Sequence, residues 1–274
     1  MLWPQVVITF TQQIFEKGLV LHLQKSRLCI KPSNMKRTAI CQGCWEQRHV
    51  PIAIRGPFSI LFKPFGITKS QMHPNLCTIC ESQFTRVKKN KQISIDATIL
   101  FADIRGYTEM SQQVETAEMN DVLHLFYDKC SQAVWNNEGI INKFIGDAVF
   151  AIFNFPLVRP QHVLNAVGSA VELQQNCKAL KQKIGLGSEY SLGVGIGIHT
   201  GSCSMGEVGT SYRDFTAIGP VVNLASRLQG AARPGEILIT EEVFNQVKDN
   251  FPDAQSRELM LKGVSKPVTA YVIL

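Results

Sequence analysis

The sequence has no long uncharged apolar run, although 45% of its 274 residues are hydrophobic. The longest apolar stretch, residues 50–62, is interrupted by Arg55 and by prolines. It therefore falls short of the roughly 20 residues that a bilayer-spanning helix needs. We expect a chain that can build a large core and that has no transmembrane segment.

The first ten residues also lack the features of a secretory signal. No basic residue precedes their short apolar run, and no small-residue cleavage site follows it. This pattern predicts a cytoplasmic protein, in which eight cysteines would not form a disulfide scaffold. Four of them stand alone in the sequence and are expected to be small packing residues: Cys29, Cys130, Cys177 and Cys203.

Acidic residues are scarce in the first third of the chain. Residues 1–91 carry 14 Lys and Arg against 3 Asp and Glu, which leaves 14 against 19 in residues 92–274 from totals of 28 and 22. Because the basic residues are scattered and do not alternate with aromatic ones, we interpret them as solvated surface and expect no nucleic-acid partner.

The composition divides the chain into three parts. Residues 1–34 are interpreted as a leader, either disordered or placed ahead of a start at Met35. Residues 36–91 are rich in Pro, Gly and Cys and are predicted to be a loop-rich module that ends in a basic linker. Residues 92–274 show alternating helical and strand patterns and are predicted to form one domain.

The order of these patterns predicts an α+β domain with helices packed on a mostly antiparallel sheet. Strands are expected at 97–101, 191–199, 213–218, 236–240 and twice more before the C-terminus, with a hairpin over 140–153. Helices are expected at 108–114, 117–135, 160–183, 220–231 and 241–248. The alternating Gly193, Gly195 and Gly197 lie within a strand and lack a following helix, so we read them as close-packing positions and not as a dinucleotide-binding loop.

Two acidic residues follow apolar runs. Asp103 ends a predicted strand and is followed by a turn at Gly106 and a helix, whose free N–H groups suit phosphate oxygens. Asp147 lies at the tip of the predicted hairpin. Each acid alone is more simply explained as an ordinary turn residue. If the two strands are neighbours, the paired carboxylates suit two divalent cations about 3.5 to 4 Å apart.

A third motif combines an amide and a guanidinium on one helix. Pro220 suits the first turn of a helix, and Asn223 and Arg227, four residues apart, would share one face of it. A planar guanidinium is suited to phosphate, although a solvated helix face is the simpler explanation of the pair when it is considered alone.

Together the three motifs resemble the catalytic domain of the class III adenylyl and guanylyl cyclases over residues 92–274. They read Phe101-Ala-Asp103-Ile-Arg-Gly-Tyr-Thr108, Lys143-Phe-Ile-Gly-Asp147 and Gly219-x-x-x-Asn223-Leu-Ala-Ser-Arg227. The resemblance implies a ferredoxin-like cyclase domain that converts ATP to cyclic AMP and pyrophosphate at the interface of a homodimer.

The resemblance also implies a role for each matching residue. Asp103, the Ile104 carbonyl and Asp147 would hold two Mg²⁺ or Mn²⁺ ions, while Gly106, Tyr107 and Thr108 would cradle the triphosphate. Asn223 and Arg227 would come from the partner subunit, to orient the ribose and to stabilise the transition state. Lys143 and Thr216 fall on base-reading positions, in the pattern of the adenylyl cyclases. A guanylyl cyclase and a catalytically silent regulatory module are the alternatives.

The sequence departs from the family at two places. Many members have a triphosphate-binding lysine where this chain has Val264, so Lys262 or Lys266 is the candidate substitute. Pro220 follows Gly219 where bacterial members often have Asp, which a helix start tolerates.

The remaining cysteines form two CxxC pairs, Cys41 with Cys44 and Cys77 with Cys80. Four thiolates favour a structural Zn²⁺, with an iron–sulfur cluster or a redox pair as alternatives. Such a double CxxC ahead of the catalytic domain is also similar to some bacterial cyclases. His49 and His73 are spare ligand candidates that we interpret as ordinary loop histidines.

Overall fold

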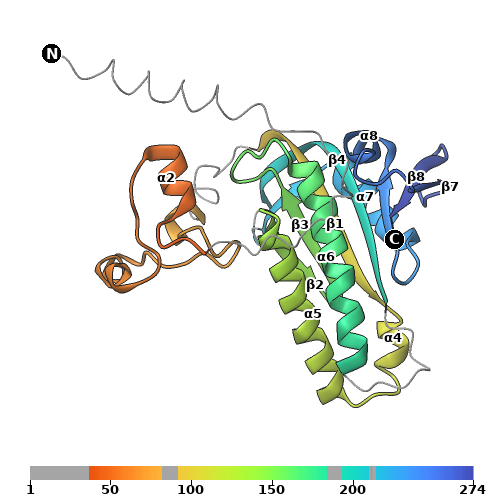
Figure 1. The fold of residues 1–274 in the computed structure, drawn as a ribbon, viewed down its shortest axis with the longest axis horizontal. Coiled ribbons are helices and arrows are strands. Elements are labelled where there is room, and N and C mark those ends of the chain that lie inside the picture. The colour runs from red at the N-terminus through yellow and green to blue at the C-terminus, as the bar shows by residue number, and fades with distance from the viewer. Residues whose placement is uncertain (1–36, 82–91, 184–192, 210, 212–213, 274) are drawn as a thin grey trace, which may run out of the picture. The chain divides into compact units, whose positions relative to one another are not determined.

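The computed structural model of the chain describes residues 37–81, 92–183, 193–209, 211 and 214–273. A mixed sheet of eight strands dominates it (Figure 1), in the order β2-β3-β1-β4-β6-β8-β7, with β5 paired to β4. Every pairing is antiparallel except that of β4 with β6, which confirms the predicted mostly antiparallel sheet. The strands are β1 (Ile93–Arg105), β2 (Ile140–Ile145), β3 (Ala148–Phe153), β4 (Gly193–Val208), β5 (Asp214–Ile218), β6 (Ile237–Thr240), β7 (Gln255–Leu259) and β8 (Val268–Ile273).

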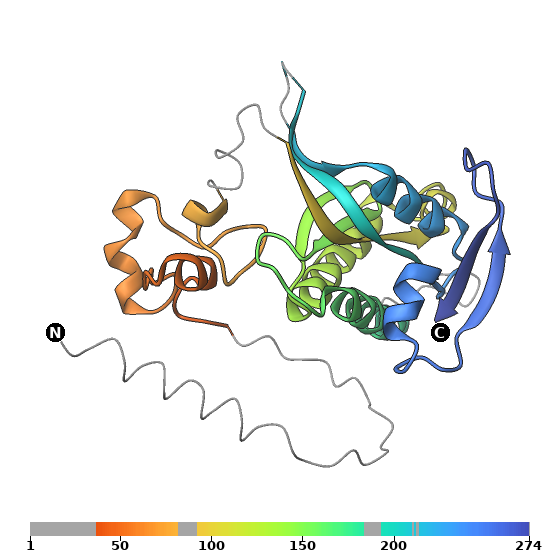
Figure 2. The ribbon, with the colours of Figure 1, turned by 90° about the horizontal axis from the view of Figure 1, so that it is seen from above.

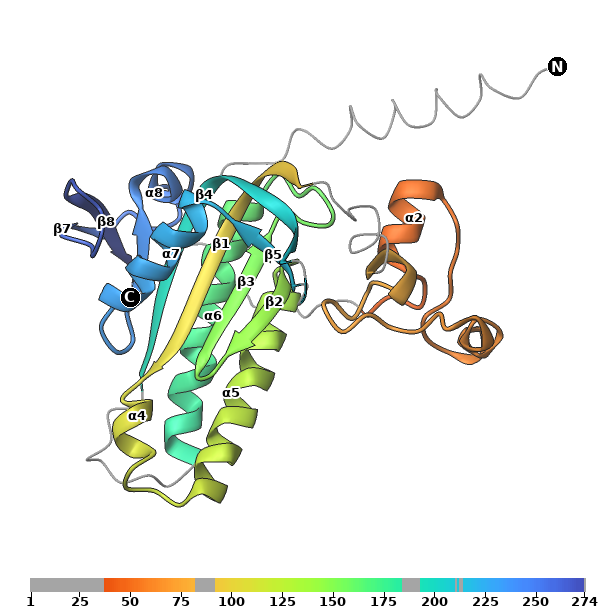
Figure 3. The ribbon, with the colours of Figure 1, turned by 180° about the vertical axis from the view of Figure 1, so that it is seen from behind.

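Helices cover both faces of this sheet (Figure 2), because successive strand residues point to opposite sides. On β1, Leu100 and Ala102 pack in the core beneath the long helices α5 (Thr116–Asn136) and α6 (His162–Lys183). The intervening Ile99 and Phe101 pack on the other face, which α7 (Pro220–Ala231) covers (Figure 3). The short helices α4 (Tyr107–Met110) and α8 (Glu241–Val247) complete the domain.

The glycines of β4 are sites of close packing, as predicted. A Cβ on Gly197 would overlap backbone atoms of Ala225 and Gln229 in α7, and a Cβ on Gly195 would overlap the Arg105 guanidinium. The strand therefore needs glycine at both positions to let α7 and Arg105 lie against it.

Four predicted elements need correction. The strand expected at 191–199 is β4, which runs on to Val208 because β1 and β5 pair with it along its length. The strand that carries Asp103 continues to Arg105, so this acid lies within the strand and not at its end. The helix expected at 108–114 is only α4, and a turn closed by the Val114 N–H on the Met110 carbonyl follows it. The predicted loop-rich module contains a helix, α2 (Gln42–Arg48), which is too short for its periodicity to show in the sequence.

The solitary cysteines behave as expected where the structure describes them. Cys130 and Cys203 are buried in the core, and Cys177 is half-buried. Burial raises the pKa of the Cys177 thiol to about 12 and that of Cys203 to about 11. Cys29, the leader and the linker at 86–91 lie outside the described residues.

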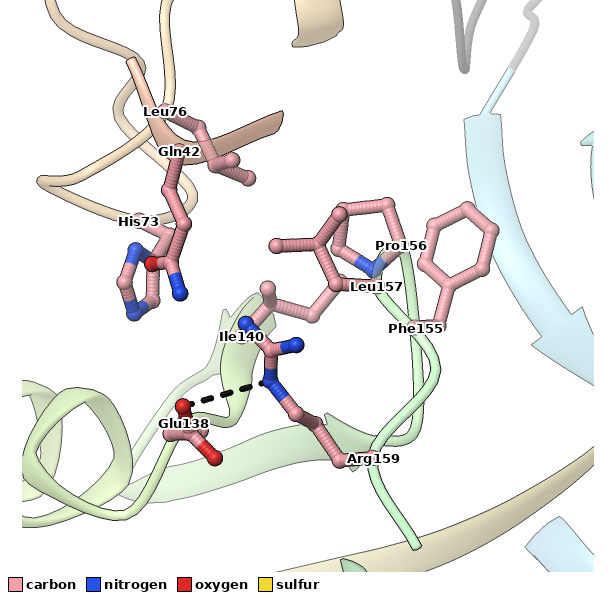
Figure 4. A pocket seen from close by; sticks show the side chains of 9 residues that line it. All are labelled: Gln42, His73, Leu76, Glu138, Ile140, Phe155, Pro156, Leu157 and Arg159. Carbon is pink, nitrogen blue, oxygen red and sulfur yellow. Dashed lines mark ion pairs between the residues drawn. The ribbon is translucent and has the colours of Figure 1, made fainter. Parts of the chain in front are cut away.

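Residues 37–81 contact the sheet domain through polar groups. Arg159 forms an ion pair with Glu46 of α2 at 3.1 Å. It also pairs with Glu138, just after α5, at 3.2 Å (Figure 4). The Trp135 indole donates to the Met72 carbonyl at 2.8 Å. The cavity that Arg159 helps to line has a volume of about 20 Å³, room for about one water and not for a substrate.

The structure offers no transmembrane candidate: among the described residues, no helix is both long and apolar enough to cross a bilayer.

Candidate active site and metal centre

Sheet pairing brings the two predicted metal-binding carboxylates together. Asp103 of β1 lies opposite Ala148 of β3, and Asp147 directly precedes Ala148 in the hairpin turn. The Ile104 N–H donates to the Asp147 carbonyl at 3.3 Å, and the Asp147 carboxylate is close enough to the Asp103 carboxylate to raise its pKa. Two acids that are far apart in the sequence thus share one site.

This site has an excess of negative charge. The pKa of Asp103 is raised to about 6, mainly by burial and next by the neighbouring Asp147 carboxylate, whose effect is larger than the opposite effect of Arg105. Arg105 Nη1 lies 2.9 Å from Asp103 Oδ2, and Gln229 Nε2 donates to the same oxygen at 3.0 Å. Within the described residues, one arginine pairs with Asp103 while a second carboxylate lies beside that acid, an arrangement that bound cations would stabilise.

Arg105 and Gln229 were not among the residues selected from the sequence. Arg105 also donates to the Gln229 carbonyl, so it connects β1 to α7. Its alternation with Asp103 on one face of the strand was a signal that could have found it. Gln229 gave no such signal, because only the packing of α7 on β4 brings it to Asp103.

The predicted triphosphate turn directly follows this strand. Gly106 has a φ of 78°, a left-handed conformation that suits glycine, and it caps α4. Tyr107 is half-buried beside the core, and Thr108 is exposed at the helix start. Ile104, whose carbonyl is a predicted metal ligand, is buried and pairs with Val194.

The two predicted base-reading residues are linked through neighbouring side chains. Lys143 of β2 forms an ion pair with Asp214 of β5. Thr216, two residues further along β5, donates to Asn142 Oδ1 at 2.9 Å, and Asn142 Nδ2 donates to the Phe215 carbonyl at 3.0 Å. The Lys143 ammonium and the Thr216 hydroxyl are therefore held near each other. Asp214, which pairs with Lys143, was not identified from the sequence.

Asn223 and Arg227 lie on α7 as predicted, the first exposed and the second half-buried. Arg227 Nη2 lies 3.1 Å from the position that a Cβ on Gly263 would take. Within the described part of the chain, neither residue forms a hydrogen bond or ion pair with Asp103 or Asp147. The two halves of the predicted site are thus not joined within one chain.

The loop beside Arg227 contains Val264, which stands where many family members have a triphosphate-binding lysine. This side chain is half-buried against the cluster of Leu228 and Leu261 and is not available to a ligand. Lys262 and Lys266 are exposed on either side of it. They are the cations that this loop can present to an anionic group.

The four cysteines of the CxxC pairs form a buried cluster. Sγ–Sγ distances are 3.4 Å for Cys44–Cys80, 3.5 Å for Cys44–Cys77 and 3.6 Å for Cys41–Cys80. All four sulfurs lie within 4.8 Å of one another. Tetrahedral coordination with Zn–S bonds of about 2.3 Å implies sulfur separations of about 3.8 Å. The cluster is therefore the size of a site for one tetrahedral ion.

The thiol chemistry also fits a cation. Burial raises the pKa of Cys44 to about 12, whereas hydrogen bonds from Cys41 and Cys80 lower the pKa of Cys77. Without a bound ion, few of the four buried thiols would ionise. A divalent cation would stabilise the thiolate form of all four. Gly43 is needed between the first two cysteines, because a Cβ there would lie 2.9 Å from Cys80 Sγ.

Neither histidine near these cysteines is part of the cluster. His49 is exposed and ends α2 in a left-handed conformation. His73 is buried, its Nδ1 accepts the Asn75 N–H at 3.1 Å, and burial lowers its pKa to about 4. Both are structural loop residues, as expected.

The fold and the paired carboxylates define a nucleotide cyclase domain. Residues 89–274 match the family described as "Adenylate and Guanylate cyclase catalytic domain", and the chain belongs to this family.

The relatives include both kinds of cyclase. An "Adenylate cyclase" of Anabaena cylindrica is 36% identical over 174 residues, which are 61% of this chain and 33% of that protein. "Adenylate cyclase 1" of Rhizobium meliloti is 29% identical over 65% of this chain and 27% of its own length. The chain thus spans about a third or less of these curated relatives.

Solved structures show the same fold. The adenylyl cyclase CyaB from P. aeruginosa superposes with a TM-score of 0.62 at 33% identity and covers 67% of this chain and 96% of its own. The guanylyl cyclase Cya2 superposes with a TM-score of 0.60 at 27% identity over 66% of this chain and 92% of its own.

Proposed function

We propose that this chain is an adenylyl cyclase that converts ATP to 3′,5′-cyclic AMP and pyrophosphate in a homodimer. The observation that carries the proposal is the meeting of Asp103 and Asp147 beside the turn at Gly106. Paired carboxylates next to a phosphate-binding turn suit a reaction in which negative charge moves between phosphate oxygens.

The residues fit two Mg²⁺ or Mn²⁺ ions. Asp103, Asp147 and the Ile104 carbonyl offer only oxygen donors, which these cations prefer. Burial and then the neighbouring Asp147 carboxylate raise the pKa of Asp103, and Arg105 offsets this only in part, so bound cations would stabilise the ionised carboxylate. When bound, the cations would act as Lewis acids toward the ribose 3′-hydroxyl and the phosphates.

The chain's own residues position the substrate. The turn of Gly106, Tyr107 and Thr108 receives the triphosphate, and Asn223 orients the ribose. The 3′-hydroxyl gives its proton to water as its oxygen forms a bond to the α-phosphorus. The bond from that phosphorus to the bridging oxygen of the β-phosphate breaks, and pyrophosphate carries that electron pair away. Arg227 neutralises the charge that develops on the α-phosphate.

We infer that Asn223 and Arg227 of one chain complete the site formed by Asp103 and Asp147 of a second copy. Within the described part of one chain they form no hydrogen bond or ion pair with Asp103 or Asp147, and a two-fold dimer would bring each pair to the other's site. Each dimer would then have two composite sites.

Adenine selection is assigned to Lys143 and Thr216. The ammonium can donate to an adenine ring nitrogen, and the hydroxyl can accept from the exocyclic amine. Asp214 and Asn142 hold the two groups in place. Guanylyl cyclases are also among the relatives, so GTP must be tested beside ATP.

We also propose a structural zinc ion on Cys41, Cys44, Cys77 and Cys80. The spacing of the sulfurs supports one tetrahedral ion better than a multi-iron cluster, and the described cysteines are all free thiols. On this basis residues 36–91 are a zinc module with a linker, and residues 92–274 are the catalytic domain. Free thiols and ATP as substrate agree with a cytoplasmic location.

The experiment is a cyclase assay of the purified chain with Mn²⁺ and either ATP or GTP. Asp147→Ala and Arg227→Ala should each lower the rate by about 100-fold or more. Mixing the two variants should restore about a quarter of the wild-type rate, because half of the scrambled dimers keep one intact site of two. Absence of cyclic AMP from the wild type would refute the proposed reaction, and absence of complementation would refute the shared site.

A further inference from the structure

The module exposes an ordered apolar loop. Residues 56–66 form two short turns, η1 (Pro57–Leu61) and η2 (Lys63–Phe65), which are a separate small coil in the orange part of the ribbon (Figure 1). Four large apolar side chains of this loop are mostly exposed: Phe58 71%, Ile60 63%, Leu61 66% and Phe65 79%. They do not belong to the core around the cysteines.

The conformation of this apolar loop is fixed by its backbone. Gly56 and Gly66 bracket it with φ values of 77° and 71°. Within it the Ser59 N–H donates to the Gly56 carbonyl at 3.1 Å, and the Ile67 N–H donates to the Phe62 carbonyl at 3.2 Å. Preorganised apolar side chains lose little further conformational freedom when they are buried.

These side chains are concentrated in a small region. Seven of the thirteen large exposed apolar residues in the described chain lie in the 45 residues of the module. Solitary exposed apolar residues are normal, but a cluster of this kind marks a contact surface.

The charge around the apolar loop identifies the partner. From Gln47 to Cys80 the sequence has no Asp or Glu. Lys63 is exposed within the loop and Lys69 is exposed three residues after it, whereas the Arg55 guanidinium is bound to the carbonyls of Thr38 and Pro74. Two copies meeting through this surface would bring like charges together, whereas an anionic surface would attract it.

We propose that this apolar loop inserts shallowly into an anionic phospholipid bilayer and so places the protein at a membrane surface. The exposed Phe and aliphatic side chains would enter the boundary between headgroups and acyl chains, and Lys63 would remain at the level of the phosphates. The proposal concerns the module alone and does not depend on the cyclase activity.

The test is co-sedimentation of the full chain with vesicles of phosphatidylcholine, with and without phosphatidylglycerol. Wild type should bind the anionic vesicles at least about tenfold better than the neutral ones. Phe58→Ser combined with Phe65→Ser should lower binding to anionic vesicles by about 100-fold. Lys63→Glu should lower it by about tenfold, and only on anionic vesicles.

A matched control replaces two equally exposed apolar residues elsewhere, Val158→Ser with Met260→Ser, at 76% and 74% exposure. This control should bind like wild type, and unchanged far-ultraviolet circular dichroism should show that both double variants are folded. Binding that survives in the loop variant, or that disappears only when residues 1–34 are deleted, overturns the proposal. So does a loop variant whose sole defect is a smaller oligomer in analytical ultracentrifugation, because the loop would then contact a second copy.

Discussion

Replacing Gly197 by Ala tests whether the approach of α7 to β4 positions the site. The new Cβ would overlap the Ala225 carbonyl oxygen and the Gln229 backbone nitrogen, and it would lie 2.8 Å from Gln229 Cα. Carbon contacts are optimal at about 3.5 to 4.0 Å, so α7 would have to recede by about 1 Å. Because the obstructing atoms are backbone, no side-chain rotation relieves the overlap.

The Gly197→Ala substitution should lower both the stability of the domain and the cyclase rate. Overpacking of this kind destabilises a folded protein by about 1 to 3 kcal/mol, which lowers the melting temperature of a domain of this size by about 2 to 4 °C for each kcal/mol. Since α7 carries Asn223 and Arg227, a displacement of about 1 Å should also lower the cyclase rate by about 100-fold. The loss of rate should therefore persist at temperatures where the variant is fully folded.

Gly230→Ala is the matched control, because it makes the same substitution in α7 where a Cβ meets nothing within 4 Å. It should stabilise the helix by up to about 1 kcal/mol and leave the rate unchanged. Both variants would be compared by thermal melting and by production of cyclic nucleotide with Mn²⁺. If Gly197→Ala is as stable and as active as Gly230→Ala, the close approach of α7 does not matter for the site.

Three further outcomes are expected. Cys77→Ser should abolish the single zinc equivalent per chain, measured by elemental analysis of the purified protein, and retention of full zinc would exclude the four-sulfur site. Asp103→Asn should remove the rise in melting temperature that Mn²⁺ gives to the wild type, and an equal rise in both proteins would place the cations elsewhere. The pKa of His73 is about 6.5 in the unfolded chain and about 4 in the folded protein. The stability that comes from keeping this imidazole neutral is therefore fully present above pH 6.5 and is lost as the pH falls toward 4. This loss is up to about 3 kcal/mol, and melting curves of His73→Gln should depend less on pH across that window.

The sequence alone determined the elements with strong periodicity and the residues within local motifs. The helix now seen as α7 was predicted with its bounds, as was the hairpin that carries Asp147, because apolar spacing and turn residues are local signals. The alternating glycines of β4 were likewise read correctly from their position within a strand. Short elements such as α2 were missed, since seven residues hold too few apolar positions to show a period.

The tertiary structure decided which distant groups meet. The register of β1 against β3 sets Asp103 beside Asp147, and the packing of α7 on β4 brings Gln229 to the same carboxylate. The pairing of Lys143 with Asp214 also depends on how the strands are arranged, which local periodicity does not encode. The sequence therefore identified the functional side chains. Sheet order and strand register determined which of these side chains are neighbours, because such contacts join residues that are far apart along the chain.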